Sequence, residues 1–144
     1  MILYLDTSAL VKLLADEDGS QAVVNAATQA ALLACHVITY AEARAALAKK
    51  QRMGELSAGD ARLSVNSLDR IWSGLKRINP DEAMVRRAGD LAERLGLRGY
   101  DSVHLAAAES MASVFGEAVD FRFAVFDQQL ASAAKALGLR TLPA

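Results

Sequence analysis

Short runs of apolar residues alternate along the chain with longer segments in which apolar residues recur every three or four positions. A short apolar run bounded by turn residues is typical of a buried strand, and the longer periodicity is typical of an amphipathic helix. The pattern predicts strands at 2–5, 35–39, 75–78, 121–126 and 139–142. It predicts helices at 7–16, from 20 to about 33, 40–54, 57–72, 79–95, 101–115 and 127–137, with a loop at 96–100.

This alternation of strands and helices indicates the fold class. Parallel strands need a crossover connection, usually a helix, so alternating elements favour a parallel sheet with helices on both faces. The predicted helix at 101–115 is apolar almost all round, as a helix buried among other elements would be. We therefore expect an α/β protein.

Acidic residues occur where the predicted strands end. Asp6 directly follows the first strand, Asp127 follows the fourth, and Glu42 lies three residues past Thr39, where the second strand gives way to a helix. Parallel strands place their carboxyl ends at one edge of the sheet, and ligands bind beyond that edge. Asp101 begins the buried helix. These four acids are therefore the candidate site residues.

Each acid also has a purely structural interpretation. Asp is a favoured helix N-cap, worth about 1 kcal/mol, and for Asp6, Asp101 and Asp127 taken singly the cap is the favoured interpretation. Glu42 has few local reasons to lie on an alanine-rich helix face. Several carboxylates at one edge would repel each other without a cation, and an all-oxygen group suits Mg²⁺ or Mn²⁺ rather than Zn²⁺.

Composition narrows the class of protein. With 144 residues, 53% of them hydrophobic, the chain is expected to form one soluble domain over residues 1–144. Its single cysteine, Cys35, excludes an intramolecular disulfide and fits a reducing cytoplasm. We expect no signal peptide, because no Lys or Arg precedes the first apolar run and Asp6 interrupts it early. We expect no membrane span, because no apolar stretch reaches about 20 residues.

The net charge of −1 neither favours nor excludes a nucleic-acid partner. Acids gathered in one pocket would leave basic residues around it as a phosphate-binding rim, although scattered charges are more often solvated helix faces. The candidate rim residues are Arg44, Lys49, Lys50, Arg52, Arg86, Arg87, Arg94 and Arg98.

Four segments combine these acids with apolar helix starts: YLDTSALVKLL, ITYAEARAAL, LRGYDSVHLAAA and FAVFDQQLASAAKALGL. In order and spacing they resemble the motifs of PIN-domain ribonucleases, above all the VapC toxins of bacterial and archaeal toxin–antitoxin pairs. The resemblance covers nearly the whole chain. It implies a three-layer α/β/α sandwich with a central, mainly parallel sheet. It also implies a Mg²⁺ or Mn²⁺ site formed by Asp6, Glu42, Asp101 and Asp127, with Thr7 or Ser8 as a nearby hydroxyl.

The resemblance implies a metal-dependent endoribonuclease that cleaves RNA phosphodiesters with a metal-activated water. In that scheme Asp6 and Asp101 bind the metal directly, and Glu42 and Asp127 hold metal waters or a second ion. One position departs from the pattern, because many relatives have Ser or Thr where this chain has Val125. A hydroxyl that helps to position Asp127 is therefore missing, which makes Asp127 the weakest of the four assignments.

The same resemblance implies a small VapB-like antitoxin as partner, with its C-terminal segment along the helices near residues 10–50. A basic side chain of the antitoxin would enter the acidic pocket in place of a metal. The alternative function is a catalytically weak PIN-like fold that binds RNA or protein. The presence of all four carboxylates favours the enzyme.

Two further residues are interpreted as packing residues. His104, on a nearly apolar helix, is expected to be a hydrogen-bonded core histidine. Trp72 is expected to pack in the core or an interface, because no basic and aromatic residues interleave around it in the sequence. A surface rich in alanine and leucine predicts a homodimer, with Trp72, Met53 and Leu56 as anchors.

Overall fold

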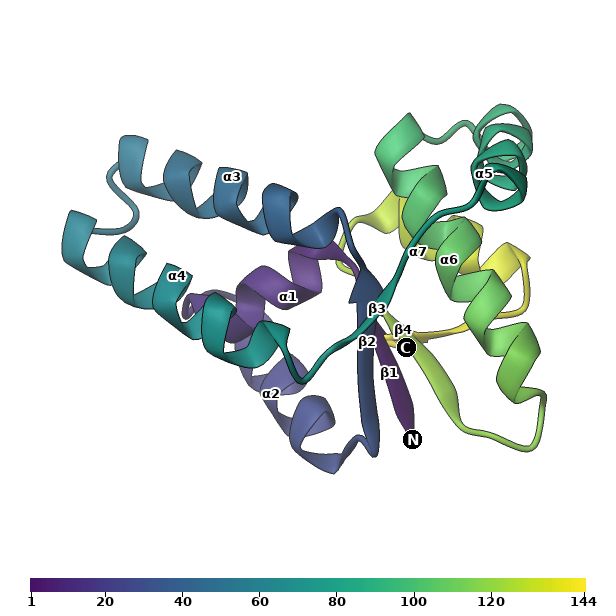
Figure 1. Ribbon diagram of the computed structural model, residues 1–144, viewed down its shortest axis with the longest axis horizontal. Helices are drawn as coiled ribbons and strands as arrows, with labels where there is room; N and C mark the ends of the chain where they lie inside the picture. The colour runs from purple at the N-terminus through teal and green to yellow at the C-terminus, as the bar shows by residue number, and fades with distance from the viewer.

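The computed structural model describes residues 1–144 and has one five-stranded parallel sheet in the order β3-β2-β1-β4-β5. Figure 1 shows helices on both faces of this sheet, so the predicted three-layer α/β/α fold is confirmed. The strands are β1 (Ile2–Leu5), β2 (Leu32–His36), β3 (Lys76–Ile78), β4 (Phe121–Ala124) and β5 (Arg140–Leu142). The helices are α1 (Thr7–Leu14), α2 (Ser20–Gln29), α3 (Thr39–Arg52), α4 (Ala58–Trp72), α5 (Glu82–Leu95), α6 (Gly99–Phe115) and α7 (Gln128–Ala136).

The central strand β1 is buried on both faces. Leu3 and Leu5 pack into an apolar cluster with α1 to α4, whereas Ile2 and Tyr4 pack into a second cluster with α5 to α7. Because successive side chains of a strand point to opposite faces, a strand covered on both sides must be apolar at every position. The unbroken run at the start of the chain is therefore explained by its place between the two cores.

The strand order reverses at β1, with β2 and β3 on one side and β4 and β5 on the other. Ligands of open α/β sheets bind at such a switch point, beyond the carboxyl ends of the strands. Two hydrogen bonds join the segment that follows β1 to the segment at the end of β4. The Asp6 N–H donates to the Ala124 carbonyl at 3.1 Å, and the Phe126 N–H donates to Ser8 Oγ at 3.3 Å.

The second strand lies earlier than the sequence pattern predicts. It occupies residues 32–36 rather than 35–39, and the preceding helix ends at Gln29 rather than near 33. The alanine-rich run favours a helix by propensity. Pairing of Leu32 and Leu33 with β1 outweighs that local preference, because β1 needs a neighbour at its edge.

The start of α6 also differs from the prediction. The helix begins at Gly99 with Arg98 as its N-cap residue, so part of the expected loop at 96–100 is helical. Asp101 therefore lies in the first turn and does not cap the helix. The predicted fifth strand is present as β5.

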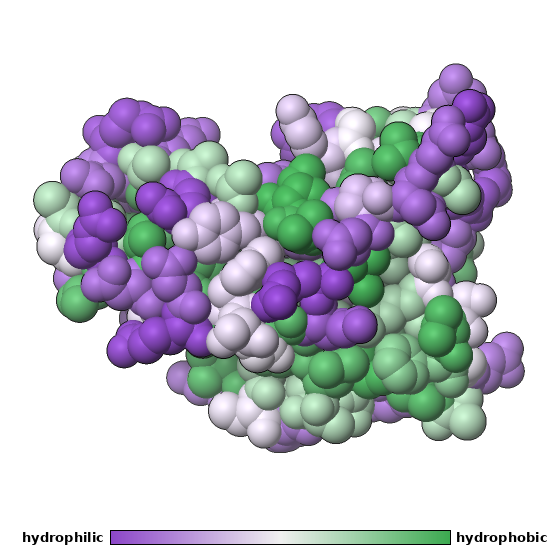
Figure 2. All heavy atoms as spheres, in the orientation of Figure 1, coloured by the Kyte–Doolittle hydropathy of each residue, from purple (hydrophilic) through white to green (hydrophobic).

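Helices α3 and α4 pack side by side and extend away from the sheet as an arm (Figure 1). Figure 2 shows mainly hydrophilic side chains over this arm, and an indentation of the surface between it and the α5–α6 side. None of the helices has both the length and the apolar character that crossing a membrane requires.

Candidate functional site

Asp6 connects β1 to α1 and is buried, with 5% of its surface exposed. Its Oδ1 accepts hydrogen bonds from the Ala9 N–H at 2.8 Å and from Ser8 Oγ at 2.7 Å, so the predicted N-cap is confirmed. Burial raises the pKa of Asp6 to about 6, although both hydrogen bonds lower it, and the nearby Asp101 charge adds to the increase. Oδ2 accepts no hydrogen bond from the protein, and capping therefore leaves one oxygen available to a ligand.

Glu42, in the first turn of α3, points toward α1 and α6. Its Oε1 accepts a hydrogen bond from Thr7 Oγ1 at 2.8 Å and lies 2.7 Å from His104 Nε2. Burial alone would raise the pKa of Glu42, but the hydrogen bonds from His104 and Thr7 outweigh burial and hold it below 4.5. Glu42 is therefore a carboxylate near neutral pH, and His104 Nε2–H is the donor. One acid thus connects three helices.

His104, which contacts Glu42, also packs against a second buried histidine, His36. The rings of His36 and His104 meet edge to face, with centroids 6.1 Å apart. His36 Nδ1 accepts the Ile38 N–H at 3.0 Å, which places the His36 proton on Nε2. Burial and the neighbouring His104 lower the pKa of His36 to about 4, so this ring is neutral near pH 7. His36 Nε2 and His104 Nδ1 are both buried without a hydrogen-bond partner.

The other two acids contact different groups. Asp101 Oδ2 accepts a hydrogen bond from Arg98 Nε at 3.1 Å, one turn earlier along the chain. Asp127 is exposed and caps α7 by accepting the Leu130 N–H at 2.8 Å. Asp6, Glu42 and Asp127 lie past the carboxyl ends of β1, β2 and β4, and Asp101 lies near enough to Asp6 for its charge to raise the pKa of Asp6. No three of the His, Cys, Asp or Glu side chains converge closely enough to hold a metal ion.

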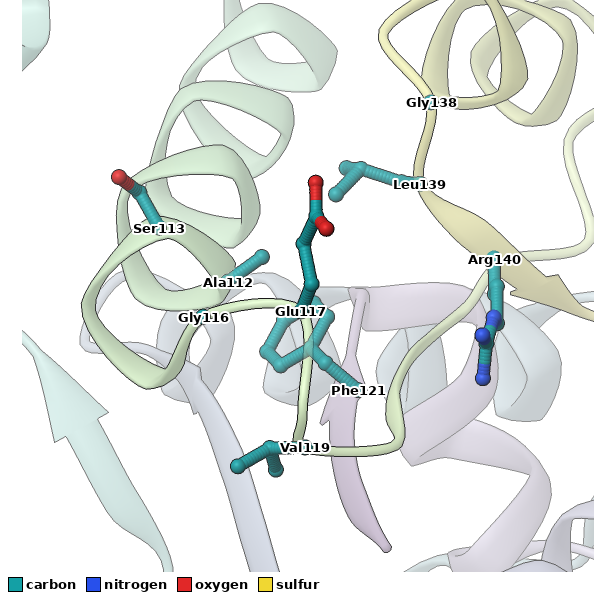
Figure 3. Close-up of a pocket in the computed structure, with 9 residues that line it drawn as sticks. All are labelled: Ala112, Ser113, Gly116, Glu117, Val119, Phe121, Gly138, Leu139 and Arg140. Atoms are coloured by element: carbon teal, nitrogen blue, oxygen red, sulfur yellow. The ribbon is translucent and has the colours of Figure 1, made fainter.

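A pocket of about 650 Å³ lies at the opposite edge of the sheet. Figure 3 shows that its lining comes from the end of α6, the segment leading into β4, and the start of β5. Phe121 and Arg140, the first residues of their strands, belong to it. None of the four candidate acids lines this pocket, so its size does not bear on the site at the carboxyl edge.

Sequence reasoning did not assign His104 to the site, and it named Arg98 only as one of eight candidate rim residues. The expectation that His104 is buried and hydrogen-bonded is confirmed, with 2% of its surface exposed, but its partner is a candidate site acid. The available signal was its spacing, because a residue three positions after Asp101 lies on the same side of a helix. Arg98 lies three positions before Asp101, so the same spacing places it on the same side of the helix start.

Comparisons with known proteins agree with this fold. The family model described as PIN domain matches residues 3–136. The chain is 32% identical over 143 residues to two proteins of Mycobacterium tuberculosis, Ribonuclease VapC45 of strain CDC 1551 / Oshkosh and Ribonuclease VapC49 of strain ATCC 25618 / H37Rv. In each case the match covers 99% of this chain and 96% of the relative.

Solved structures share the fold at lower sequence identity. PAE2754 from Pyrobaculum aerophilum has a TM-score of 0.65 and 22% identity, over 99% of this chain and 93% of that one. A toxin–antitoxin complex from Klebsiella pneumoniae has a TM-score of 0.60 and 15% identity, over 90% of each chain. At these identities the likeness extends to the fold.

Proposed function

Because the chain belongs to the PIN-domain family, we propose that it is a divalent-metal-dependent endoribonuclease and the toxin of a toxin–antitoxin pair. The full-length similarity to two ribonucleases supports RNA cleavage. The observation that carries the proposal is Asp6, a buried carboxylate at the switch point of the sheet with one oxygen free of protein hydrogen bonds. A buried carboxylate is costly, and a cation beside it offsets that cost.

In the type of their ligand atoms the acids at the carboxyl edge suit a hard divalent cation, Mg²⁺ or Mn²⁺, although no three of them converge in this structure. Every acid there offers oxygen, and neither buried histidine belongs to a zinc-type group. Asp6 and Asp101 would hold the cation directly, and Glu42 and Asp127 would hold its waters or a second ion. When bound, such a cation lowers the pKa of a water and neutralises charge on the scissile phosphate.

The chain's own side chains prepare this edge. Thr7 and His104 hold Glu42 ionised and fix its carboxylate from two different helices. Ser8 holds Asp6 and also accepts the Phe126 N–H, which ties the orientation of Asp6 to the segment that carries Asp127. Arg98 partly neutralises Asp101, so a bound cation must compete with this guanidinium.

We further propose that a small antitoxin binds the chain and blocks the site. A solved structure with this fold is a toxin–antitoxin complex, which supports such a partner. The antitoxin would lie along α1 to α3 and insert a basic side chain among the acids, as Arg98 already approaches Asp101. We place the protein in the cytoplasm, where RNA is available as a substrate. The buried free thiol of Cys35 is compatible with the reducing environment there.

Cleavage mapping on total RNA tests the enzymatic proposal. Wild type, Asp6→Asn and the exposed control Lys135→Gln are incubated with Mg²⁺, with Mn²⁺ and with EDTA. We expect wild type and Lys135→Gln to cut at defined positions in a divalent cation only, and Asp6→Asn to lose orders of magnitude in rate. Cleavage by wild type in EDTA would refute the metal site. Binding of RNA with no cleavage in either cation would favour the alternative, a binding module.

A further inference from the structure

Four side chains of alternating chemistry meet on the surface of the arm, and we call them the Arg–aromatic patch (Tyr40, Arg44, Trp72 and Arg77). The Tyr40 and Trp72 rings pack edge to face with centroids 5.2 Å apart. The Arg44 guanidinium lies over the Tyr40 ring at 5.8 Å, and the Arg77 guanidinium lies over the Trp72 ring at 5.7 Å. The residues come from α3, α4 and β3, so the interleaving that is absent from the sequence around Trp72 arises in the folded chain.

The two arginines of the patch have no acidic partner. Arg44 donates to the Tyr40 hydroxyl at 3.1 Å and Arg77 donates to the Trp72 carbonyl, and neither forms a salt bridge. Asp69, the nearest acid of this group, accepts the Tyr40 hydroxyl at 2.7 Å. Residues 40–78 carry eight Lys and Arg against four Asp and Glu, although the whole chain has a net charge of −1. The arm together with β3 is therefore a basic part of a protein that is slightly acidic overall.

The patch and Glu42 lie on opposite sides of the first turn of α3. Tyr40 and Glu42 lie in the first turn of α3, two residues apart and thus on opposite sides of a helix about 10 Å wide. Glu42 faces α1 and α6, whereas Tyr40 faces α4. Arg77 lies on β3, beside the carboxyl end of β2. A nucleic-acid strand that extends from the acids across the start of α3 would reach the patch.

We propose that the Arg–aromatic patch binds single-stranded RNA that flanks the cleavage site, an assignment that rests on the proposed ribonuclease function. Bases stack on aromatic faces at about 1–3 kcal/mol each and without strong sequence preference. Arginine binds phosphate through its planar fork and stacks on aromatic rings. Unpaired arginines held beside partly exposed rings supply both contacts, and the arm's excess of positive charge suits a polyanion.

The test measures binding separately from cleavage. A fluorescein-labelled oligouridine RNA is titrated in EDTA with full-length protein carrying Asp6→Asn, so that the RNA stays intact, and anisotropy is recorded over a range of salt concentrations. Added to this background are Arg44→Gln with Arg77→Gln, Trp72→Leu, Trp72→Phe and the control Lys135→Gln. Thermal melts check that each variant folds. Trp72 is the only tryptophan, so its fluorescence reports on the patch directly.

We expect the double arginine variant to bind about tenfold more weakly and to lower the slope of log Kd against log salt by about 1.4, since each phosphate contact on a single strand contributes about 0.7. Trp72→Leu should weaken binding about tenfold or more, and Trp72→Phe should largely retain it. RNA should quench Trp72 emission in the background protein. Lys135→Gln should match that protein.

Unchanged RNA affinity and salt slope in the folded patch variants would overturn the assignment while leaving RNA cleavage by wild type intact. If those variants instead lose binding to a co-expressed antitoxin, the patch is a protein-binding surface and the RNA assignment is wrong. If wild type binds RNA through the patch but never cleaves it, the ribonuclease function fails and the patch stands.

Discussion

Replacing Asp6 with Asn removes the charge of the only fully buried acid while keeping an oxygen that can cap α1. Asn caps a helix about as well as Asp, so the hydrogen bonds from Ser8 and Ala9 can persist. Burial raises the pKa of Asp6 from 3.8 to about 6. At 1.36 kcal/mol for each pH unit, this difference corresponds to about 3 kcal/mol. Without metal and near neutral pH, we expect the variant to exceed wild type in free energy of unfolding by up to about 3 kcal/mol.

The direction of the pH dependence follows from which state binds the proton more tightly. Between the unfolded pKa of 3.8 and the folded pKa of about 6, the folded protein retains the Asp6 proton better than the unfolded chain. Rising pH in this window therefore lowers the stability of wild type relative to the variant. The difference should be near zero below about pH 4 and should reach its full size above about pH 6.

A bound divalent cation reverses the comparison, because a ligand that binds only the folded state stabilises it by RT ln(1 + [L]/Kd). Mg²⁺ should raise the stability of wild type more than that of Asp6→Asn. Urea unfolding followed by circular dichroism, at about pH 4 and about pH 7.5 and in EDTA or Mg²⁺, measures each quantity. Asp16→Asn removes an exposed charge and should change stability by less than about 0.5 kcal/mol.

Two results would refute this reasoning. If Asp6→Asn is less stable than wild type at about pH 7.5 in EDTA, or if the difference does not vary with pH, Asp6 is not a destabilised buried carboxylate. If Mg²⁺ stabilises both proteins equally, Asp6 does not hold the cation.

Four further predictions concern other parts of the structure. His104→Phe leaves Glu42 with only the Thr7 hydrogen bond, so we expect the free energy of unfolding in urea to fall by about 1–3 kcal/mol. His104→Gln retains a hydrogen-bond donor and should lower it less. Equal losses for the two variants would contradict a role of His104 in holding Glu42. Gly19→Ala should lower stability by about 1–3 kcal/mol, because Gly19 has φ +89° and an added Cβ would lie 2.7 Å from Phe126 Cε1. Gly89→Ala, in open space within α5, should instead stabilise by about 0.5–1 kcal/mol, and urea unfolding of both glycine variants measures the two changes. Sedimentation at micromolar concentration should show a homodimer that Met53→Ser, at a 64% exposed position on the arm, shifts toward monomer; a strictly monomeric wild type would exclude this dimer.

The sequence predicts the position of an acid well where one short pattern marks the end of a buried strand. Asp6 directly follows β1, and Asp127 lies three residues past the end of β4, which stops at Ala124 rather than at 126 as predicted; parallel pairing of β1 with β4 brings the two segments together. The boundary of β2 is less predictable, because alanine near residue 30 suits a helix and only pairing with β1 selects the strand. Local preference and tertiary pairing disagree there, and pairing decides.

Contacts between distant helices lie outside the reach of a pattern. His104 and Glu42 are 62 positions apart, and nothing near either residue specifies the other. The Arg–aromatic patch likewise depends on where α3, α4 and β3 cross. Whether the four acids together bind a metal stays a prediction, since their side chains pair with protein groups in this structure.

The central position of β1 has a consequence for how the molecule is made. Ile2 pairs with Phe121, so the middle of the sheet cannot close until almost the whole chain is available. Contacts of such long sequence separation slow folding, because a large loop must be ordered before they form. The switch point that carries Asp6 is thus among the last features to appear during synthesis. A chain truncated before β4 would therefore lack the assembled carboxyl edge on which the candidate acids lie.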